Sequence, residues 1–475
     1  MIFASYKFIV FFLIVITGFV ALNKFKLYLV SELWLVLSSF YFYAQGSMSF
    51  LPFFIFTVFF NYIVGSMIIQ QDGEYAIRNR KVLLAIGLAE NILLLGYFKY
   101  TDFFISNYNL ITKQAVPLRN IILPIGISFF TFQLIAYLVD CYRGETKEYT
   151  VINYLLFITF FPQLIVGPIV HHKDIVPQFE SGKQFRLNER NIMLGILIFS
   201  IGCSKKLLLA DPLTNYAQEF FKNVYAGGIF RRWTSVLAYT ISYYFDLSGY
   251  ADMAIGLALF FNIKLPQNFN SPYKARNFRD YWRRWHMSLS KFLSAYVFRS
   301  VYKKGDSSIR FYLAVMITFF VSGFWHGAGW RFVLWGIVNG IFVCAAHFMA
   351  RRKWGLPFPL AWLLTFAGVV AARIIFVAHS IRDALYVYRS MFNFSEFSGM
   401  GLTEIFLASR KFIVFNSYTL SVLALGMCIA FLGKNTEEIT DNFSPRYKYA
   451  VAAGMLLIIS FFQMSSVANF LYFQF

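Results

Sequence analysis

The stretch FYLAVMITFFVSGFWHGAGWRFVLWGIVNGIFVCAAHFM, residues 311–349, decides the class of fold. It contains two apolar runs, Phe311–Gly323 and Phe332–Met349, separated by a break rich in glycine and tryptophan. His326 lies in this break, which carries no charge before Arg331. Paired apolar runs of this kind predict helices that cross a membrane, so His326 is expected at or near membrane depth.

Similar runs recur along all 475 residues, of which 58% are hydrophobic and only 14% are charged. A soluble domain carries about 25% charged residues, and disorder requires low hydrophobicity, so both classes are excluded. We predict an all-α integral membrane protein with about 11–12 transmembrane helices plus re-entrant segments, in a single polytopic domain over residues 1–475. The candidate spans are Phe8–Leu22, Leu27–Ala44, Phe50–Ile69, Val82–Phe98, Ile121–Val139, Ile192–Ala210, Trp233–Asp246, Phe311–Gly323, Phe332–Met349, Leu360–Ala378, Phe412–Leu432 and Tyr449–Phe462.

Two further apolar stretches, Leu155–Val170 and Tyr250–Ile263, are predicted to be re-entrant instead of spanning. The first contains two prolines and a glycine, and the second follows Gly249 directly after a candidate span. Broken backbone is tolerated at membrane depth only when it is buried in protein or lines a cavity. A kinked but complete helix is the alternative for each. The positions expected in a tunnel or re-entrant segment are Pro162, Gln163, Gly167, Pro168 and Asn268.

The formal net charge is +20, and basic residues cluster most strongly in Lys264–Arg310. Lys and Arg collect in cytoplasmic loops and near anionic lipid headgroups, so this segment is predicted to be cytoplasmic and in contact with membrane lipids. No basic stretch forms a recognisable nucleic-acid-binding module, so we expect no nucleic-acid partner. The first run, Phe8–Leu22, is interpreted as a retained span and not as a cleaved signal peptide.

Three histidine-containing segments are candidates for chemistry. His171-His172-Lys173-Asp174 has a metal-like composition, but adjacent residues do not share a helical face; we predict a polar loop facing lipid headgroups and no metal site. His286 ends a segment in which aromatic residues alternate with arginines, for which an interfacial amphipathic helix is the alternative. His326 has an imidazole that titrates near neutral pH and suits a general base; a histidine satisfied by a backbone carbonyl is the alternative.

Several longer motifs carry a resemblance to a known family. They are LPIGISF (123–129), FFPQLIVGPI (160–169), YFDLSGYADMAIG (244–256), YWRRWH (281–286), GFWHG (323–327) and YFQF (472–475). Together they resemble the membrane-bound O-acyltransferase (MBOAT) family, and within it the bacterial alginate O-acetyltransferase branch. The Phe324 position often holds Leu in relatives.

The resemblance implies a ring of tilted helices around a central tunnel, with residues 264–340 as the catalytic core segment. It implies acyl transfer from a cytoplasmic thioester, acetyl-CoA or an acyl carrier, with no bound cofactor. His326 matches the catalytic histidine of the family, and His286 matches its second functional position. The implied function is O-acetylation of an exported cell-envelope polysaccharide, alginate-like, from the bacterial inner membrane. Peptidoglycan or another cell-wall polymer is the alternative acceptor, and a periplasmic acyltransferase or esterase-like partner is expected to complete the transfer.

The residues themselves support the same chemistry. A hydroxyl is a poor nucleophile at neutral pH, and His326 is placed to accept its proton. We predict that four arginines bind the donor phosphates, with anionic lipid as their alternative ligand, and that one tryptophan also belongs to the donor site. These residues are Arg276, Arg279, Trp282, Arg283 and Arg284. A transporter or flippase would predict paired broken helices in two halves, which the sequence lacks, and a non-catalytic scaffold would need neither histidine.

Overall fold

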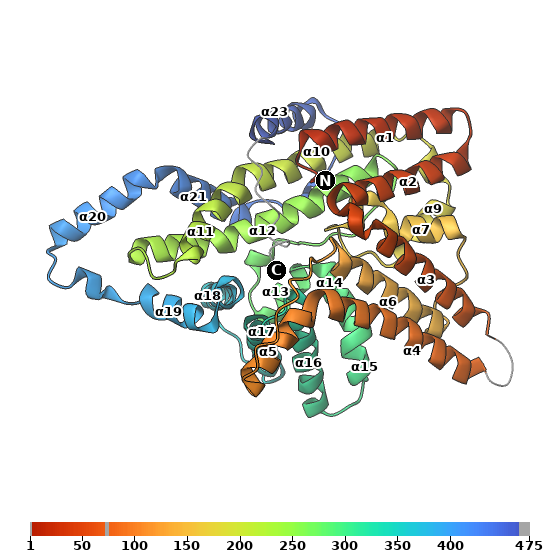
Figure 1. Ribbon diagram of the computed structural model, residues 1–475. Coiled ribbons are helices and arrows are strands. Elements are labelled where there is room, and N and C mark those ends of the chain that lie inside the picture. The colour runs from red at the N-terminus through yellow and green to blue at the C-terminus, as the bar shows by residue number, and fades with distance from the viewer. Residues whose placement is uncertain (1, 72–75, 465–475) are drawn as a thin grey trace. The chain divides into compact units, whose positions relative to one another are not determined.

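The structure is a computed structural model that describes residues 2–71 and 76–464 (Figure 1). This part of the chain is built from helices and contains no strand, so the predicted all-α class is confirmed. It divides into two compact units, which we describe separately. The first unit comprises residues 1–199, 251–267 and 445–451, and the second comprises 200–250, 268–444 and 452–475. The terminal motif at 472–475 lies outside the described residues.

The first unit is a helical bundle in which α3, α4 and α6 lie side by side (Figure 1). Small residues allow this close packing. A β-carbon at Gly65 of α3 would lie 2.3 Å from the Tyr137 ring of α6, and one at Gly87 of α4 would lie 2.5 Å from Leu138. The helices of this unit are α1 (Tyr6–Lys24), α2 (Tyr28–Ser47), α3 (Leu51–Ile69), α4 (Ala76–Leu95), α5 (Thr101–Thr112), α6 (Ile127–Arg143), α7 (Val151–Thr159), α8 (Phe161–Leu164) and α9 (His172–Glu180).

The second unit contains the segment that the sequence analysis singled out. Its helices are α11 (Asp211–Lys222), α13 (Phe278–Arg284), α14 (Met287–Leu293), α15 (Arg299–Val301), α16 (Ser308–His326), α17 (Trp330–Arg351), α18 (Phe358–Val377), α19 (Ile381–Met391), α20 (Leu402–Phe415), α21 (Ser417–Leu432) and α22 (Thr436–Asp441). Three helices contribute to both units: α10 (Glu189–Ser204), α12 (Ile229–Leu259) and α23 (Tyr447–Gln463).

Every predicted apolar run overlaps a helix, but Ile121–Val139 begins before α6, and Phe412–Leu432 crosses the bend between α20 and α21. The number of runs therefore differs from the number of candidate spans. Seven helical segments in the described part are long and apolar enough to cross a membrane, or eight if the bent pair α20 and α21 forms one span. Tyr28–Ile69 is one of the seven and includes two of the predicted runs. Other runs lie on helices with fewer than 18 residues, such as α6 with 17 and α23 with 17. Helices of this length cross only a thinned bilayer or need flanking residues to complete the span.

The two predicted re-entrant segments have different outcomes. In Leu155–Val170 the helix is broken: α7 ends at Thr159, the single turn α8 follows, and the chain is non-helical from Ile165. The second prediction is wrong, because α12 continues through Gly249 as one 31-residue helix to Leu259. Gly249 packs where a β-carbon would lie 2.8 Å from the carbonyl oxygen of Gly202, so this glycine serves close helix packing and does not end the helix.

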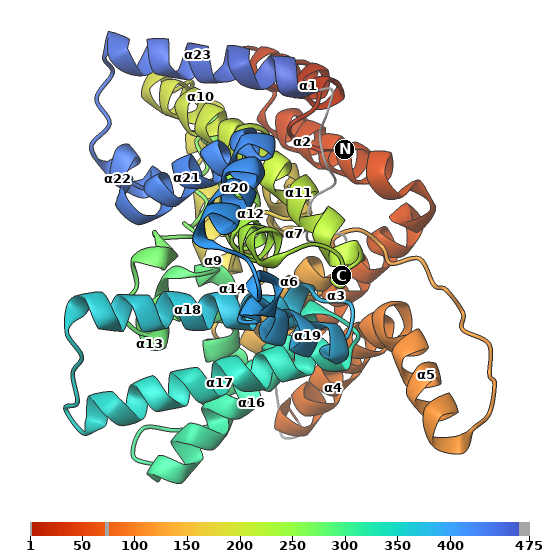
Figure 2. The same ribbon diagram turned by 90° about the vertical axis from the view of Figure 1, so that its left-hand side faces the viewer.

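Helices α16 and α17 of the second unit pack closely and run side by side (Figure 2). A β-carbon on Gly323 of α16 would lie 2.3 Å from the carbonyl oxygen of Phe332. A β-carbon on Gly336 of α17 would lie 2.3 Å from the carbonyl oxygen of Phe319. The two glycines therefore let the backbones touch, which fixes the position of the histidine that ends α16.

Candidate active site

His326 is the last residue of α16, and its side chain is buried. The helix ends there because Gly327 adopts an extended conformation, with φ of −171°. A β-carbon on Gly327 would lie 2.1 Å from the Phe332 ring, so only glycine fits at this exit. The imidazole is surrounded by rings, with Trp335 at 5.0 Å and Phe376 at 5.5 Å between centroids. His326 therefore sits on a rigid helix end in a mainly aromatic environment.

His286 is also buried, and it forms the N-cap of α14 in a left-handed conformation, with φ of 44° and ψ of 56°. A second segment holds this turn: the Asn268 carbonyl accepts from the Met287 amide at 2.9 Å, and the Asn268 side-chain oxygen accepts from the Ser288 hydroxyl at 3.0 Å. Burial lowers the pKa of His286 to about 4, so the imidazole is neutral at physiological pH. Its Nδ1 has no hydrogen-bond partner among the described residues.

A network of aromatic rings connects the segments that carry the two histidines. Phe376 of α18 contacts His326 and also lies 5.5 Å from Tyr243 of α12. Tyr243 in turn stacks on Trp285 at 5.8 Å with an interplanar angle of 10°. Because Trp285 directly precedes His286, the structure places both predicted histidines in one aromatic core of the second unit.

An open cavity of about 370 Å³ lies in the same unit. Three of the residues predicted to bind the donor, Arg279, Trp282 and Arg283 of α13, line it together with largely apolar side chains of α14 and α16. Ser322 also lines the cavity, and it lies one helical turn before His326 on α16. The cavity therefore combines cationic groups with a lining residue one turn from the candidate base.

Two of the predicted donor-binding arginines lie elsewhere. The Arg284 guanidinium pairs with Asp280 at 2.8 Å and donates to the Asn270 carbonyl at 3.3 Å. Arg284 and Arg276 line a different cavity, of about 1050 Å³, beside α18 and α21. The grouping of four arginines in one site is therefore not reproduced, because neighbouring residues on α13 point to different sides.

The predicted tunnel or re-entrant residues divide between the two units. Pro162, Gln163, Gly167 and Pro168 belong to the first unit, at the break after α7, whereas Asn268 belongs to the second. Gln163 is buried and its side-chain amide donates to the Phe157 carbonyl at 2.6 Å. A β-carbon on Gly167 would lie 2.4 Å from the Gln163 Cα, which explains the glycine in this turn.

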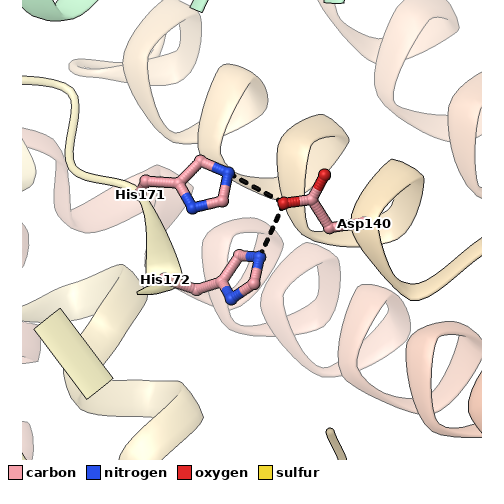
Figure 3. A group of neighbouring side chains, drawn as sticks. All are labelled: Asp140, His171 and His172. Atoms are coloured by element: carbon pink, nitrogen blue, oxygen red, sulfur yellow. Dashed lines mark hydrogen bonds and ion pairs between the residues drawn. The ribbon is translucent and has the colours of Figure 1, made fainter. Parts of the chain in front are cut away.

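The His171-His172 segment differs from the prediction of a lipid-facing loop, because both rings turn toward buried Asp140 of α6 (Figure 3). The Nε2 atoms of His171 and His172 lie 2.8 Å and 2.9 Å from the same Asp140 oxygen. Adjacent side chains converge here because His171 is the extended N-cap of α9 and only His172 is helical. Burial alone would raise the pKa of Asp140, but hydrogen bonds from the two histidines hold it below its usual range.

These three residues have the chemistry of metal ligands, and their ligand atoms lie within 4.8 Å of one another. Their other contacts fit a hydrogen-bonded cluster better. Neutral His172 donates from Nε2 to Asp140 and accepts the Tyr149 hydroxyl at Nδ1, at 2.8 Å. His171 accepts the Lys173 amide at Nδ1, and the Lys173 ammonium lies 3.6 Å from Asp140. A metal would need the Nε2 lone pairs and would place a second cation beside this ammonium.

The second unit also contains two sets of buried charges that were not predicted from the sequence. Lys206 forms ion pairs of 2.7 Å with both Asp211 and Asp246. Arg373 is buried on α18, with its guanidinium carbon 4.0 Å from the Tyr243 ring centre. Arg373 and Asp246 lie in predicted apolar runs, and a charge inside such a run is a signal of function or of a buried partner.

The sequence of this chain is similar to those of known proteins. The family model of the membrane-bound O-acyltransferases matches residues 107–353. A peptidoglycan O-acetyltransferase of Helicobacter pylori is 38% identical over 94% of this chain and 91% of its own length. A probable alginate O-acetylase of Pseudomonas aeruginosa is 34% identical over 91% of this chain and 81% of its own length. A teichoic acid D-alanyltransferase of Bacillus subtilis is 26% identical over 57% of this chain and 70% of its own length.

The fold and these relatives define a multi-pass membrane enzyme that transfers acyl groups. The chain belongs to the membrane-bound O-acyltransferase family, as its motifs predicted, and is an O-acyltransferase.

Proposed function

We propose that this enzyme transfers an acetyl group from a cytoplasmic thioester to an acceptor hydroxyl, and so moves it across the membrane for O-acetylation of an exported cell-envelope polysaccharide. Relatives that cover most of the chain are named for acetylation of two such polymers, peptidoglycan and alginate. Both polymers are therefore candidate acceptors.

The observation that carries the proposal is the position of His326 relative to the cavity. The cavity is lined by Arg279 and Arg283 and also by Ser322, one turn from His326. Guanidinium groups bind phosphates through charge-assisted hydrogen bonds, and a CoA or carrier arm brings phosphates and a thioester on one flexible chain. The apolar lining between them suits the acyl arm.

The proposed reaction follows from these groups. His326 accepts the proton of the attacking hydroxyl, and the hydroxyl oxygen forms a C–O bond with the thioester carbonyl carbon. The resulting oxyanion collapses, the C–S bond breaks, and the leaving thiolate takes up the proton. The bonds and protons in this reaction balance without a cofactor. His286 stays neutral at physiological pH because burial lowers its pKa to about 4, so it suits a hydrogen-bonding role better than proton storage.

The proposed setting is the bacterial inner membrane, where Lys264–Arg310 faces the cytoplasm and the donor. This orientation follows from the basic excess of the segment. We further propose that a periplasmic acyltransferase or esterase-like protein receives the acyl group and completes its transfer to the polymer.

His326→Ala tests the proposal. Removing a general base costs a factor of about 10² to 10⁴, so ester-linked acetate on the polymer should fall to background while the protein remains in the membrane. The measurement is alkali-released acetate from purified peptidoglycan and, separately, from exopolysaccharide, alongside the membrane level of each variant. The polymer that loses acetate identifies the acceptor.

His379→Ala is the matched control, because His379 is exposed and lies beyond the end of α18. It should keep most of the activity. Near-normal acetylation by a well-expressed His326→Ala protein would exclude the enzymatic role of this histidine and favour a scaffold.

A further inference from the structure

Arg373 is a buried charge that the reaction above does not use. It is the only charged residue in α18, one of the candidate spans, and its exposed fraction is 4%. Charged side chains at membrane depth are expensive and usually face an interior where they serve function. The position of this guanidinium therefore needs an explanation.

The surroundings of Arg373 are mainly aromatic. The guanidinium carbon lies 4.0 Å from the Tyr243 ring centre and 5.1 Å from that of Trp285. Among the described residues Arg373 forms no ion pair with a carboxylate, and its Nε has no hydrogen-bond partner. Cation–π contacts compensate part of the cost of burial, but a buried cation without a counter-charge still favours any negative charge that appears nearby.

Both candidate histidines are near this cation. Trp285, on which the guanidinium lies, directly precedes His286. Phe376, one turn along α18, lies 5.6 Å from the guanidinium carbon and 5.5 Å from the His326 ring. These two distances place the cation within about 11 Å of the His326 ring, a range at which a unit charge in a protein interior changes a rate by about tenfold.

We propose that Arg373 is an electrostatic residue of the acyl-transfer site. Its positive charge stabilises the oxyanion and the leaving thiolate as they form. This inference rests on the proposed function, because the negative charge arises only when a hydroxyl attacks a thioester. No carboxylate among the described residues pairs with the guanidinium and offsets this charge beforehand.

The test compares Arg373→Gln, which removes the charge, with Arg373→Lys, which keeps it. Thiol release from acetyl-CoA is measured in membranes with the protein level quantified, and kcat is separated from the donor KM. We expect Arg373→Gln to lower kcat about tenfold or more with a donor KM within twofold of the unmodified enzyme. Arg373→Lys should retain kcat within about threefold, because a charge at this site is what matters. A merely structural arginine would not show rescue by lysine, since lysine lacks the flat guanidinium that stacks on the rings.

Arg352→Gln is the control, since its guanidinium lies 5.5 Å from the Phe348 ring on the exposed end of α17. It should leave kcat unchanged. An unchanged kcat in Arg373→Gln, or equal losses in the Gln and Lys variants, would overturn the inference. If the Arg373→Gln protein does not accumulate in the membrane, the test depends on Arg373→Lys. A near-normal kcat of this variant would support the role of the charge, and a loss of kcat at normal protein level would refute it. His326→Ala in the same membranes separates the two proposals, because its activity would contradict the proposed function itself.

Discussion

Arg283 and Arg284 are adjacent on α13, yet their replacement by alanine should have different consequences. Arg283 is exposed and lines the 370 Å³ cavity with Arg279, one turn earlier. Arg284 points elsewhere and is held by Asp280 at 2.8 Å. Successive helical residues are about 100° apart, so one arginine can face the donor cavity while the next secures the helix.

The sizes of the two effects follow from these environments. A hydrogen bond to a charged group is worth about 1.5–3 kcal/mol, and exposure of Arg283 favours the lower end, so Arg283→Ala should raise the donor KM about tenfold. The value of kcat should change little, because the phosphate contact is the same in the ground state and the transition state. Arg284→Ala should leave the donor KM within about twofold and lower stability by about 0.5 kcal/mol, as expected for a half-exposed i,i+4 ion pair.

The assay is an acetyl-CoA titration of thiol release by the unmodified enzyme and the two variants, at equal membrane levels. Arg283→Lys should fall between the unmodified enzyme and Arg283→Ala, since lysine keeps the charge without the bidentate geometry. Equal increases in KM for Arg283→Ala and Arg284→Ala would refute the inference that only Arg283 faces the donor cavity. An unchanged KM in both would favour anionic lipid as the ligand of these arginines.

Two further predictions concern contacts that hold the fold. Asn268→Ala removes the acceptor of the buried Ser288 hydroxyl, so it should lower stability in detergent by about 1–3 kcal/mol. It should also reduce kcat, because the turn that carries His286 is no longer held. The double variant Asn268→Ala/Ser288→Ala should recover part of the stability. A stability loss as large in the double variant would contradict this. Burial lowers the pKa of His172, so the folded state should be most stable above the unfolded pKa of about 6.5. Stability should decline as the pH falls from there through the pKa of His172 in the folded state. Apparent melting temperatures between pH 8 and 5 test this, and a pH-independent melting temperature in the unmodified protein would be the contrary result. Asp140→Asn should lower the melting temperature because it removes the negative charge that both histidines share.

The sequence predicted the class of fold because membrane helices are recognised from composition alone. Apolar runs marked the helices, and proline marked the break after α7. Gly249 was misinterpreted as the end of a helix because the sequence does not reveal the neighbouring backbone at Gly202. Glycine in a membrane helix serves either as a packing contact or as a break, and only the partner helix distinguishes the two.

The sequence indicated which residues were candidates for a site, but it did not predict where their side chains lie. The aromatic and arginine-rich segment that ends at His286 was identified from its composition, but composition could not assign Arg283 and Arg284 to different sides. Similarly, His171 and His172 converge on Asp140 because His171 precedes the helix in an extended conformation. The φ and ψ angles of this one residue could not be predicted from the sequence. Arg373 was visible as a charge in an apolar run, and its significance appeared only with its distance to Tyr243 and Trp285.

The glycines around His326 show how packing prepares the site. Gly323 and Gly336 bring α16 and α17 into backbone contact, and Gly327 makes room for the Phe332 ring. A β-carbon at any of these positions would push against a neighbouring backbone or ring and shift His326 relative to Trp335, which lies 5.0 Å away. Because reacting groups tolerate misplacement of only about 1 Å, these glycines contribute to catalysis by fixing a helix end, without contacting a substrate.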